Sequence, residues 1–125
     1  MTKKRILVVD DEPAMTSLAR ANLERTGLYE VRTENQAWAT LAAAREFRPD
    51  LILLDVMMPG MLGSEVAAQL DADAELSKTK YVFLTCMVTR DEANLSHGEI
   101  GGHVFMAKPI NVTDLCRIIE EQLQA

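Results

Sequence analysis

Five short apolar segments recur along the chain at similar spacing, and they constrain the fold more than any other feature. The segments are residues 6–9, 29–33, 51–54, 81–84 and 104–107. Most are continuously apolar, which is typical of strands buried on both faces of a parallel sheet. Successive segments start 23, 22, 30 and 23 residues apart, so each interval has room for the helix of a parallel crossover. The sequence therefore predicts an α/β fold, a doubly wound (βα)5 arrangement around a five-stranded parallel sheet.

The first two intervals contain residues that begin and end helices. Pro13 suits a first helical turn, Gly27 suits a left-handed residue after a helix, and Asn35 is expected to cap the second helix. Residues at helical spacing are Met15, Leu18, Ala19 and Leu23 in the first helix, and Trp38, Leu41, Ala42 and Arg45 in the second. We expect the first set to form one buried face, and Trp38 to lie in the core or to cap the surface.

The rest of the chain also contains residues that indicate where helices begin or end. Ser64 is expected to cap a helix over 65–70, and a helix over 89–95 is expected to be short because three glycines follow it closely. Asn111 and Asp114 resemble a capping box for the last helix. The expected inner face of that helix is Leu115, Ile118, Ile119 and Leu123.

Size and charge narrow the functional classes. The 125 residues suit one domain, residues 1–125, and no apolar run exceeds four residues, which argues against a membrane span. The net charge of −6 makes direct nucleic-acid binding a poor expectation, because such binding needs a basic face. Cys86 and Cys116 form no ligand pattern and are expected to stay reduced. We therefore expect a cytoplasmic protein.

Polar residues follow four of the five predicted strands. Asp10 and Asp11 follow the first strand, Asp55 the third, Thr85 the fourth and Lys108 the fifth. In an open α/β sheet, ligands bind at the carboxyl ends of the strands. The second strand ends in Thr33 and Glu34, which match no such signature, and this fits the order 2-1-3-4-5 with that strand at the margin.

Three carboxylates at one edge need positive charge. At 4 Å and an effective dielectric constant near 20, each pair costs about 4 kcal/mol. Lys108 offsets one charge, and an all-oxygen site that needs further positive charge suits Mg²⁺. Such a site is suited to receive a phosphoryl group, with Asp55 as the nucleophile, Lys108 on the phosphoryl oxygens and Thr85 donating a hydrogen bond.

These residues resemble the receiver domain of two-component response regulators over essentially the whole chain. The resemblance is carried by residues 8–13 (VVDDEP), residues 50–60 (DLILLDVMMPG) with Gly63, Thr85, and Lys108-Pro109. It implies a flavodoxin-like, chemotaxis-regulator-like fold. It also implies that a histidine kinase or histidine phosphotransfer protein phosphorylates Asp55.

The resemblance assigns roles within the site. Asp11, Asp55 and the backbone carbonyl of Met57 are expected to bind Mg²⁺, and Asp10 is expected to assist. Lys108 and Thr85 are expected to contact the phosphoryl group, and Pro109 is expected to follow a cis peptide bond.

The resemblance further implies a conformational switch. Thr85 and Phe105 are expected to move toward the phosphoryl group. The surface formed by the fourth helix, fifth strand and fifth helix is then expected to bind a downstream protein, and a homodimer is possible on such a face.

Among the departures from common receivers, three positions bear on the chemistry at Asp55. Met57 and Met87 stand where receivers often carry side chains that influence hydrolysis of the acyl phosphate, and thioethers do not position water as carboxylates or amides do. We therefore expect a long-lived phosphorylated state. Cys86 stands where Ala or Ser is more usual, and its bulk is expected either to narrow access to Asp55 or simply to pack.

The sequence is compatible with several functions, which we rank. The favoured interpretation is a signalling module rather than an enzyme. One alternative is an interaction scaffold that works without phosphorylation. A Mg²⁺-dependent aspartyl phosphohydrolase ranks lower, because its second acid/base aspartate would stand where Met57 stands. A nucleotide- or flavin-binding protein ranks lowest, since no glycine-rich phosphate motif follows the first strand. The chain fits either a single-domain regulator or a receiver taken from a longer protein.

Overall fold

The sheet has the predicted parallel topology. The computed structural model describes residues 3–85, 99–100, 103–108 and 110–124. The parallel strands are β1 (Lys4–Val9), β2 (Tyr29–Glu34), β3 (Leu51–Asp55), β4 (Lys80–Thr85) and β6 (His103–Ala107). Their order is β2-β1-β3-β4-β6, so the predicted order 2-1-3-4-5 is confirmed with β6 as the fifth strand. The two-residue strand β5 (Glu99–Ile100), antiparallel to β6, was not predicted.

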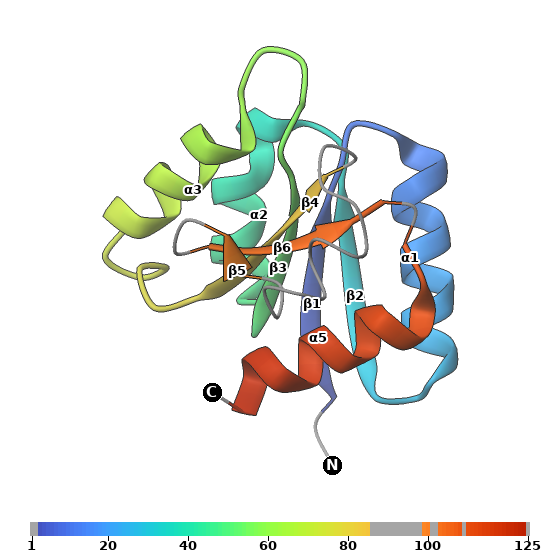
Figure 1. Ribbon diagram of the computed structural model, residues 1–125. Coiled ribbons are helices and arrows are strands. Elements are labelled where there is room, and N and C mark those ends of the chain that lie inside the picture. The colour runs from blue at the N-terminus through green and yellow to red at the C-terminus, as the bar shows by residue number, and fades with distance from the viewer. Residues whose placement is uncertain (1–2, 86–98, 101–102, 109, 125) are drawn as a thin grey trace.

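Helices cover both faces of this sheet (Figure 1). The helical elements are α1 (Pro13–Arg25), the 3₁₀ turn η1 (Ala37–Ala39), α2 (Thr40–Phe47), α3 (Gly63–Ala72) and α5 (Val112–Gln124). The apolar residues of α1 and α5 pack on one face of the sheet, and those of α2 and α3 pack on the other. No helix in the described part of the chain is long and apolar enough to cross a membrane.

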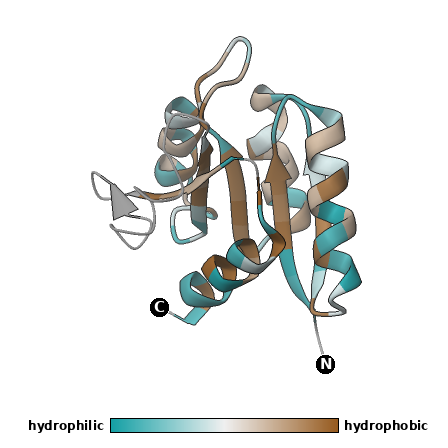
Figure 2. Ribbon diagram, turned by 45° about the vertical axis from the view of Figure 1, so that its right-hand side comes forward, coloured by the Kyte–Doolittle hydropathy of each residue, from teal (hydrophilic) through white to brown (hydrophobic). Residues whose placement is uncertain are grey.

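Burial on both faces explains why the sequences of the central strands are continuously apolar. Residues 6–9 of β1 and 51–54 of β3 are fully buried. Alternate side chains enter opposite cores: Ile6 and Val8 pack with the α1/α5 layer, whereas Leu7 and Val9 pack with the α2/α3 layer. Figure 2 shows these strands as the hydrophobic centre of the molecule. Burial on both faces, as predicted, leaves only the strand ends free to carry polar chemistry.

The predicted buried face of the first helix is partly wrong, and the predicted cap of the second helix is wrong. In α1 the buried residues are Thr16, Ala19 and Leu23, and Leu18 is 62% exposed because it lies beside that stripe rather than within it. In the second interval, η1 precedes α2, so Asn35 does not cap a helix. The buried residues of α2 are Thr40, Ala43 and Ala44. Trp38 is 73% exposed.

Other helix ends follow the predicted chemistry more closely. Gly27 has a φ of 78°, the left-handed conformation expected after α1. The side chain of Asn111 accepts a hydrogen bond from the Asp114 N–H at 3.2 Å, which confirms this part of the predicted cap. The third helix begins at Gly63, one residue before the predicted cap Ser64. The predicted helix over 89–95 lies outside the described residues.

Candidate functional site

Four parallel strands deliver the predicted polar residues to one edge of the sheet. Asp55 and Thr85 are the last residues of β3 and β4, and Asp10 and Lys108 directly follow β1 and β6. The register keeps these ends level, because Thr85 pairs with Ala107 and the Lys108 N–H donates to the Thr85 carbonyl at 2.9 Å. The predicted juxtaposition of these residues is therefore present in the structure.

The ammonium group of Lys108 joins two carboxylates. Its Nζ lies 2.6 Å from Oδ2 of Asp10 and 3.2 Å from Oδ1 of Asp55. Asp10 is fully buried, Asp55 is 5% exposed, and the Lys108 side chain is 18% exposed. Because little water reaches these groups, the charges interact more strongly than they would at the surface.

A third carboxylate completes the cluster. Carboxylate oxygens of Asp10, Asp11 and Asp55 lie within 4.8 Å of one another, and Asp11 is the most exposed of the three. One lysine faces three acidic groups, so the cluster keeps a negative excess. Carboxylate oxygens close together with a charge deficit form a donor set that suits a hard divalent cation.

Burial and neighbouring charges shift the pKa values in this cluster. Burial, followed by the charge of Asp10, raises the pKa of Asp55, while Lys108 and the backbone N–H of Met57 act in the opposite direction. Burial alone would lower the pKa of Lys108, but Asp10 and Asp55 together raise it. Lys108 is therefore cationic at neutral pH, as an electrostatic role toward phosphoryl oxygens requires.

The turn after β1 is fixed by contacts that sequence reasoning missed. The Glu12 N–H donates to Oδ1 of Asp10 at 2.9 Å. The Asn35 amide donates to the Asp10 carbonyl at 2.8 Å and to the Thr16 hydroxyl at 3.0 Å. The one available signal was that Asn35 follows β2 at the same edge of the sheet.

Gly63 lies directly against the backbone of Asp55. A Cβ at Gly63 would lie 2.4 Å from the Asp55 carbonyl oxygen and 3.0 Å from the Cα of Val56. The Gly63 N–H also donates to the Val56 carbonyl at 2.8 Å. The absence of a side chain at this position therefore lets α3 begin against the strand end that carries Asp55.

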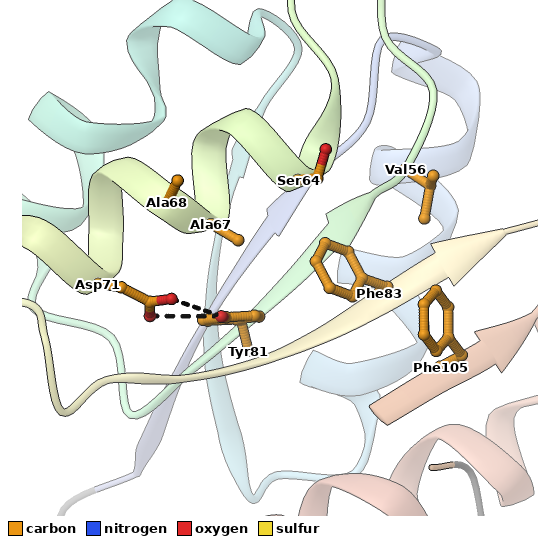
Figure 3. A pocket seen from close by; sticks show the side chains of 8 residues that line it. All are labelled: Val56, Ser64, Ala67, Ala68, Asp71, Tyr81, Phe83 and Phe105. Carbon is orange, nitrogen blue, oxygen red and sulfur yellow. Dashed lines mark hydrogen bonds between the residues drawn. The ribbon is translucent and has the colours of Figure 1, made fainter. Parts of the chain in front are cut away.

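Phe105, predicted as a switch residue, lines a pocket against α3. Its ring is partly buried and stacks on Phe83, with ring centroids 5.2 Å apart. Both rings line a pocket of about 320 Å³ against α3, whose wall includes Ser64 and Ala67 (Figure 3). The motion expected of Phe105 and of the buried Thr85 stays a prediction.

The predicted roles of four other residues stay predictions. The Met57 side chain is 58% exposed, and its backbone carbonyl stays a predicted metal ligand. Cys86, Met87 and Pro109 lie outside the described residues, so their predicted roles in access, hydrolysis and cis geometry are untested.

Comparison with known proteins shows which family the chain belongs to. Residues 6–120 match the model of the response regulator receiver domain. Alkaline phosphatase synthesis transcriptional regulatory protein PhoP of Bacillus subtilis is 38% identical over 111 residues, which are 86% of this chain and 43% of PhoP. Polar-differentiation response regulator DivK of Brucella anthropi is 34% identical over 121 residues, 96% of each chain. Chemotaxis protein CheY4 of Vibrio cholerae, 26% identical, superposes with a TM-score of 0.80 over 96% of this chain and 98% of its own. The chain thus spans less than half of PhoP but nearly all of DivK.

Proposed function

Because this chain belongs to the family of response regulator receiver domains, we propose that Asp55 is the residue that accepts its phosphoryl group. Receiver domains are signalling modules of two-component systems, and phosphoacceptance is their general function. The observation that carries the assignment to Asp55 is the position of Lys108, whose ammonium contacts this carboxylate beside two further aspartates.

The same cluster supports Mg²⁺ as the cofactor. Receiver domains bind Mg²⁺ in an acidic active site, and the oxygens of Asp10, Asp11 and Asp55 supply hard ligands with an excess of negative charge. Asp11 and Asp55 would hold the ion together with the Met57 carbonyl, and Asp10 would assist. When bound, the ion neutralises charge on the phosphoryl oxygens.

The transfer reaction follows from the chemistry of these groups. A carboxylate oxygen of Asp55 attacks the phosphorus of a phosphohistidine donor, and the P–N bond breaks as the P–O bond forms. The electron pair of that bond returns to the imidazole nitrogen of the donor. Lys108 stabilises the negative charge on the transferred oxygens, and the Thr85 hydroxyl donates a hydrogen bond to them. No group of this chain needs to gain or lose a proton.

The donor needs a surface next to this site. A groove of about 480 Å³ beside α1 is lined by residues that include Met15, the exposed Leu18, Ile110 and Lys108. Its lining is mainly apolar, and it borders the group that would contact the incoming phosphoryl oxygens. We assign this groove to the apolar face of a helix of the histidine kinase or histidine phosphotransfer protein that carries the phosphohistidine.

We propose the surface that binds a downstream target by its elements rather than by individual residues. Response regulators interact with histidine kinases and with downstream targets. Here β6 carries Phe105, and α5 packs its buried residues Leu115, Ile118 and Ile119 on the sheet. The proposed target or dimer surface includes the outer sides of these elements, and the fourth helix expected beside them lies outside the described residues. We expect a domain that signals with a kinase in this way to work in the cytoplasm.

Two other functions have less support. An aspartyl phosphohydrolase would need an acid or base two residues after its nucleophile, and Met57 supplies an exposed thioether there. A scaffold that works without phosphorylation would not need Lys108 held between Asp10 and Asp55.

The direct test is the intact mass of the protein after incubation with acetyl phosphate and Mg²⁺. We expect one added phosphoryl group, absent from Asp55→Asn and absent when EDTA removes the metal. A folded protein that gains no phosphoryl group from acetyl phosphate or from a phosphohistidine protein would favour the scaffold function. Release of many equivalents of phosphate from ordinary phosphomonoesters would favour the hydrolase.

A further inference from the structure

The two clustered carboxylates after β1 are joined by one peptide unit. The carbonyl of Asp10 belongs to the peptide bond between Asp10 and Asp11, so its orientation fixes where the Asp11 side chain starts. Rotation of this peptide would change the separation between the Asp11 carboxylate and the carboxylates of Asp10 and Asp55. The relative placement of the ligands therefore depends on what holds this carbonyl.

Asn35 holds the carbonyl from the neighbouring strand. Its Nδ2 donates to the Asp10 carbonyl at 2.8 Å and to the Thr16 hydroxyl at 3.0 Å. Thr16 is 1% exposed, and its hydroxyl in turn donates to the Pro13 carbonyl at 3.1 Å. This chain of bonds connects the end of β2, the β1–α1 turn and the first turn of α1.

The backbone pairing of the sheet does not replace this contact. The Asp10 N–H donates to the Glu34 carbonyl at 3.1 Å and so continues the β1–β2 ladder. This bond holds the peptide group that precedes Asp10. The Asn35 amide acts on the other side, at the peptide that leads to Asp11. Removing the amide should therefore leave the strand paired but release the orientation of that peptide.

We infer that Asn35, with Thr16, is a positioning residue for the divalent-cation site, although neither side chain belongs to the carboxylate cluster. The pair sets the geometry of the two carboxylates after β1 through the Asp10 carbonyl. This inference rests on the proposed Mg²⁺ site but not on phosphorylation. Outer contacts that orient metal ligands typically change metal affinity by about 10–100-fold when lost.

The test is Mg²⁺ titration by calorimetry, without a phosphoryl donor. Asn35→Leu keeps the side-chain shape and removes the donor, and it should raise the Kd for Mg²⁺ about tenfold. Thr16→Val removes the hydroxyl and should raise the Kd by a smaller factor. Gln36→Ala is the matched control, because Gln36 is the exposed neighbour of Asn35, and its Kd should equal that of the wild type.

The outcomes separate the inference from the proposed function. Equal Mg²⁺ affinity in the wild type and folded Asn35→Leu would overturn the inference, even if the wild type accepts a phosphoryl group. If Asn35→Leu does not fold, the Kd of Thr16→Val decides, and an unchanged value overturns the inference. Absence of Mg²⁺ binding to the wild type would overturn both. Weaker binding in the variants, with no phosphorylation of the wild type, would support the inference and contradict the proposed function.

Discussion

The ammonium of Lys108 lies 3.2 Å from Oδ1 of Asp55 and 2.6 Å from Oδ2 of Asp10. The lysine therefore partly neutralises the carboxylate that is proposed to react, and its ammonium is next to the oxygen on which a phosphoryl group would be placed.

Lys108→Ala should separate these two roles. Loss of the ammonium should slow phosphorylation by acetyl phosphate at least about tenfold, because the charge on the transferred oxygens loses its partner. Mg²⁺ affinity should rise, because the cation no longer competes with an ammonium for the same carboxylates. The exposed Lys78→Ala is the control. Unchanged phosphorylation in Lys108→Ala would contradict the role of Lys108.

Asp55→Asn should stabilise the protein near neutral pH. Burial raises the pKa of Asp55, so its contribution to stability is present while the carboxyl is protonated and is lost as the pH rises through its folded pKa. The amide removes the charge, and the melting temperature without Mg²⁺ should rise by roughly 2–5 °C. The difference should shrink as the pH falls into the ordinary carboxyl range. A variant that melts below the wild type at neutral pH would show that ionised Asp55 is net stabilising.

Met57 should prolong the phosphorylated state. Its thioether is exposed two residues after Asp55 and does not orient water, whereas an amide can. Met57→Asn should therefore shorten the half-life of the acyl phosphate several-fold after the donor is removed. Leu62→Asn changes another exposed apolar residue of the same loop and should leave the half-life unaltered. Rapid hydrolysis in the wild type, unaffected by Met57→Asn, would refute this role.

The groove on α1 should matter only for a protein donor. Leu18→Ala should slow transfer from a phosphohistidine protein while leaving the rate with acetyl phosphate intact, because the small donor needs no docking surface. Leu28→Ala, a similarly exposed apolar residue that is not part of the groove lining, is the control. Equal loss with both donors would place the effect in the site itself, and no loss with either would show that the groove does not dock the donor protein.

Gly63→Ala should damage the site through its backbone. The added Cβ would meet the Asp55 carbonyl at 2.4 Å, so the strand end and the start of α3 must move apart. We expect a loss of roughly 1–3 kcal/mol in the free energy of unfolding, measured by denaturant titration. Gly60→Ala tests backbone strain alone, because Gly60 has a φ of 79° but a Cβ added there would have no atom within 4 Å. A Gly63→Ala variant no less stable than Gly60→Ala would show that the contact relaxes freely.

The main features of the fold and site follow from patterns that the sequence displays directly. Strands buried on both faces are continuously apolar, and this pattern predicts the positions of β1 and β3. The polar residues that follow the strands then had to meet at one edge, which placed Lys108 beside Asp10 and Asp55 although they are far apart in the chain.

The features that were missed depend on three-dimensional details. Asn35 has the side chain of a typical helix cap, but the 3₁₀ turn η1 precedes α2, and the amide binds the β1–α1 turn instead. Leu18 has helical spacing with buried neighbours, yet it lies just outside the face that α1 presents to the sheet. The role of Gly63 depends on the distance between two backbones, which residue type alone does not reveal.

We propose that Asp55, and no other carboxylate of the cluster, accepts the phosphoryl group. Borohydride reduces an aspartyl phosphate to homoserine, so reduction of the phosphorylated protein followed by peptide mass spectrometry identifies the acceptor. We predict homoserine at position 55 alone, dependent on Mg²⁺. Homoserine at position 10 or 11, or a phosphorylated protein that yields none at position 55, would contradict the assignment.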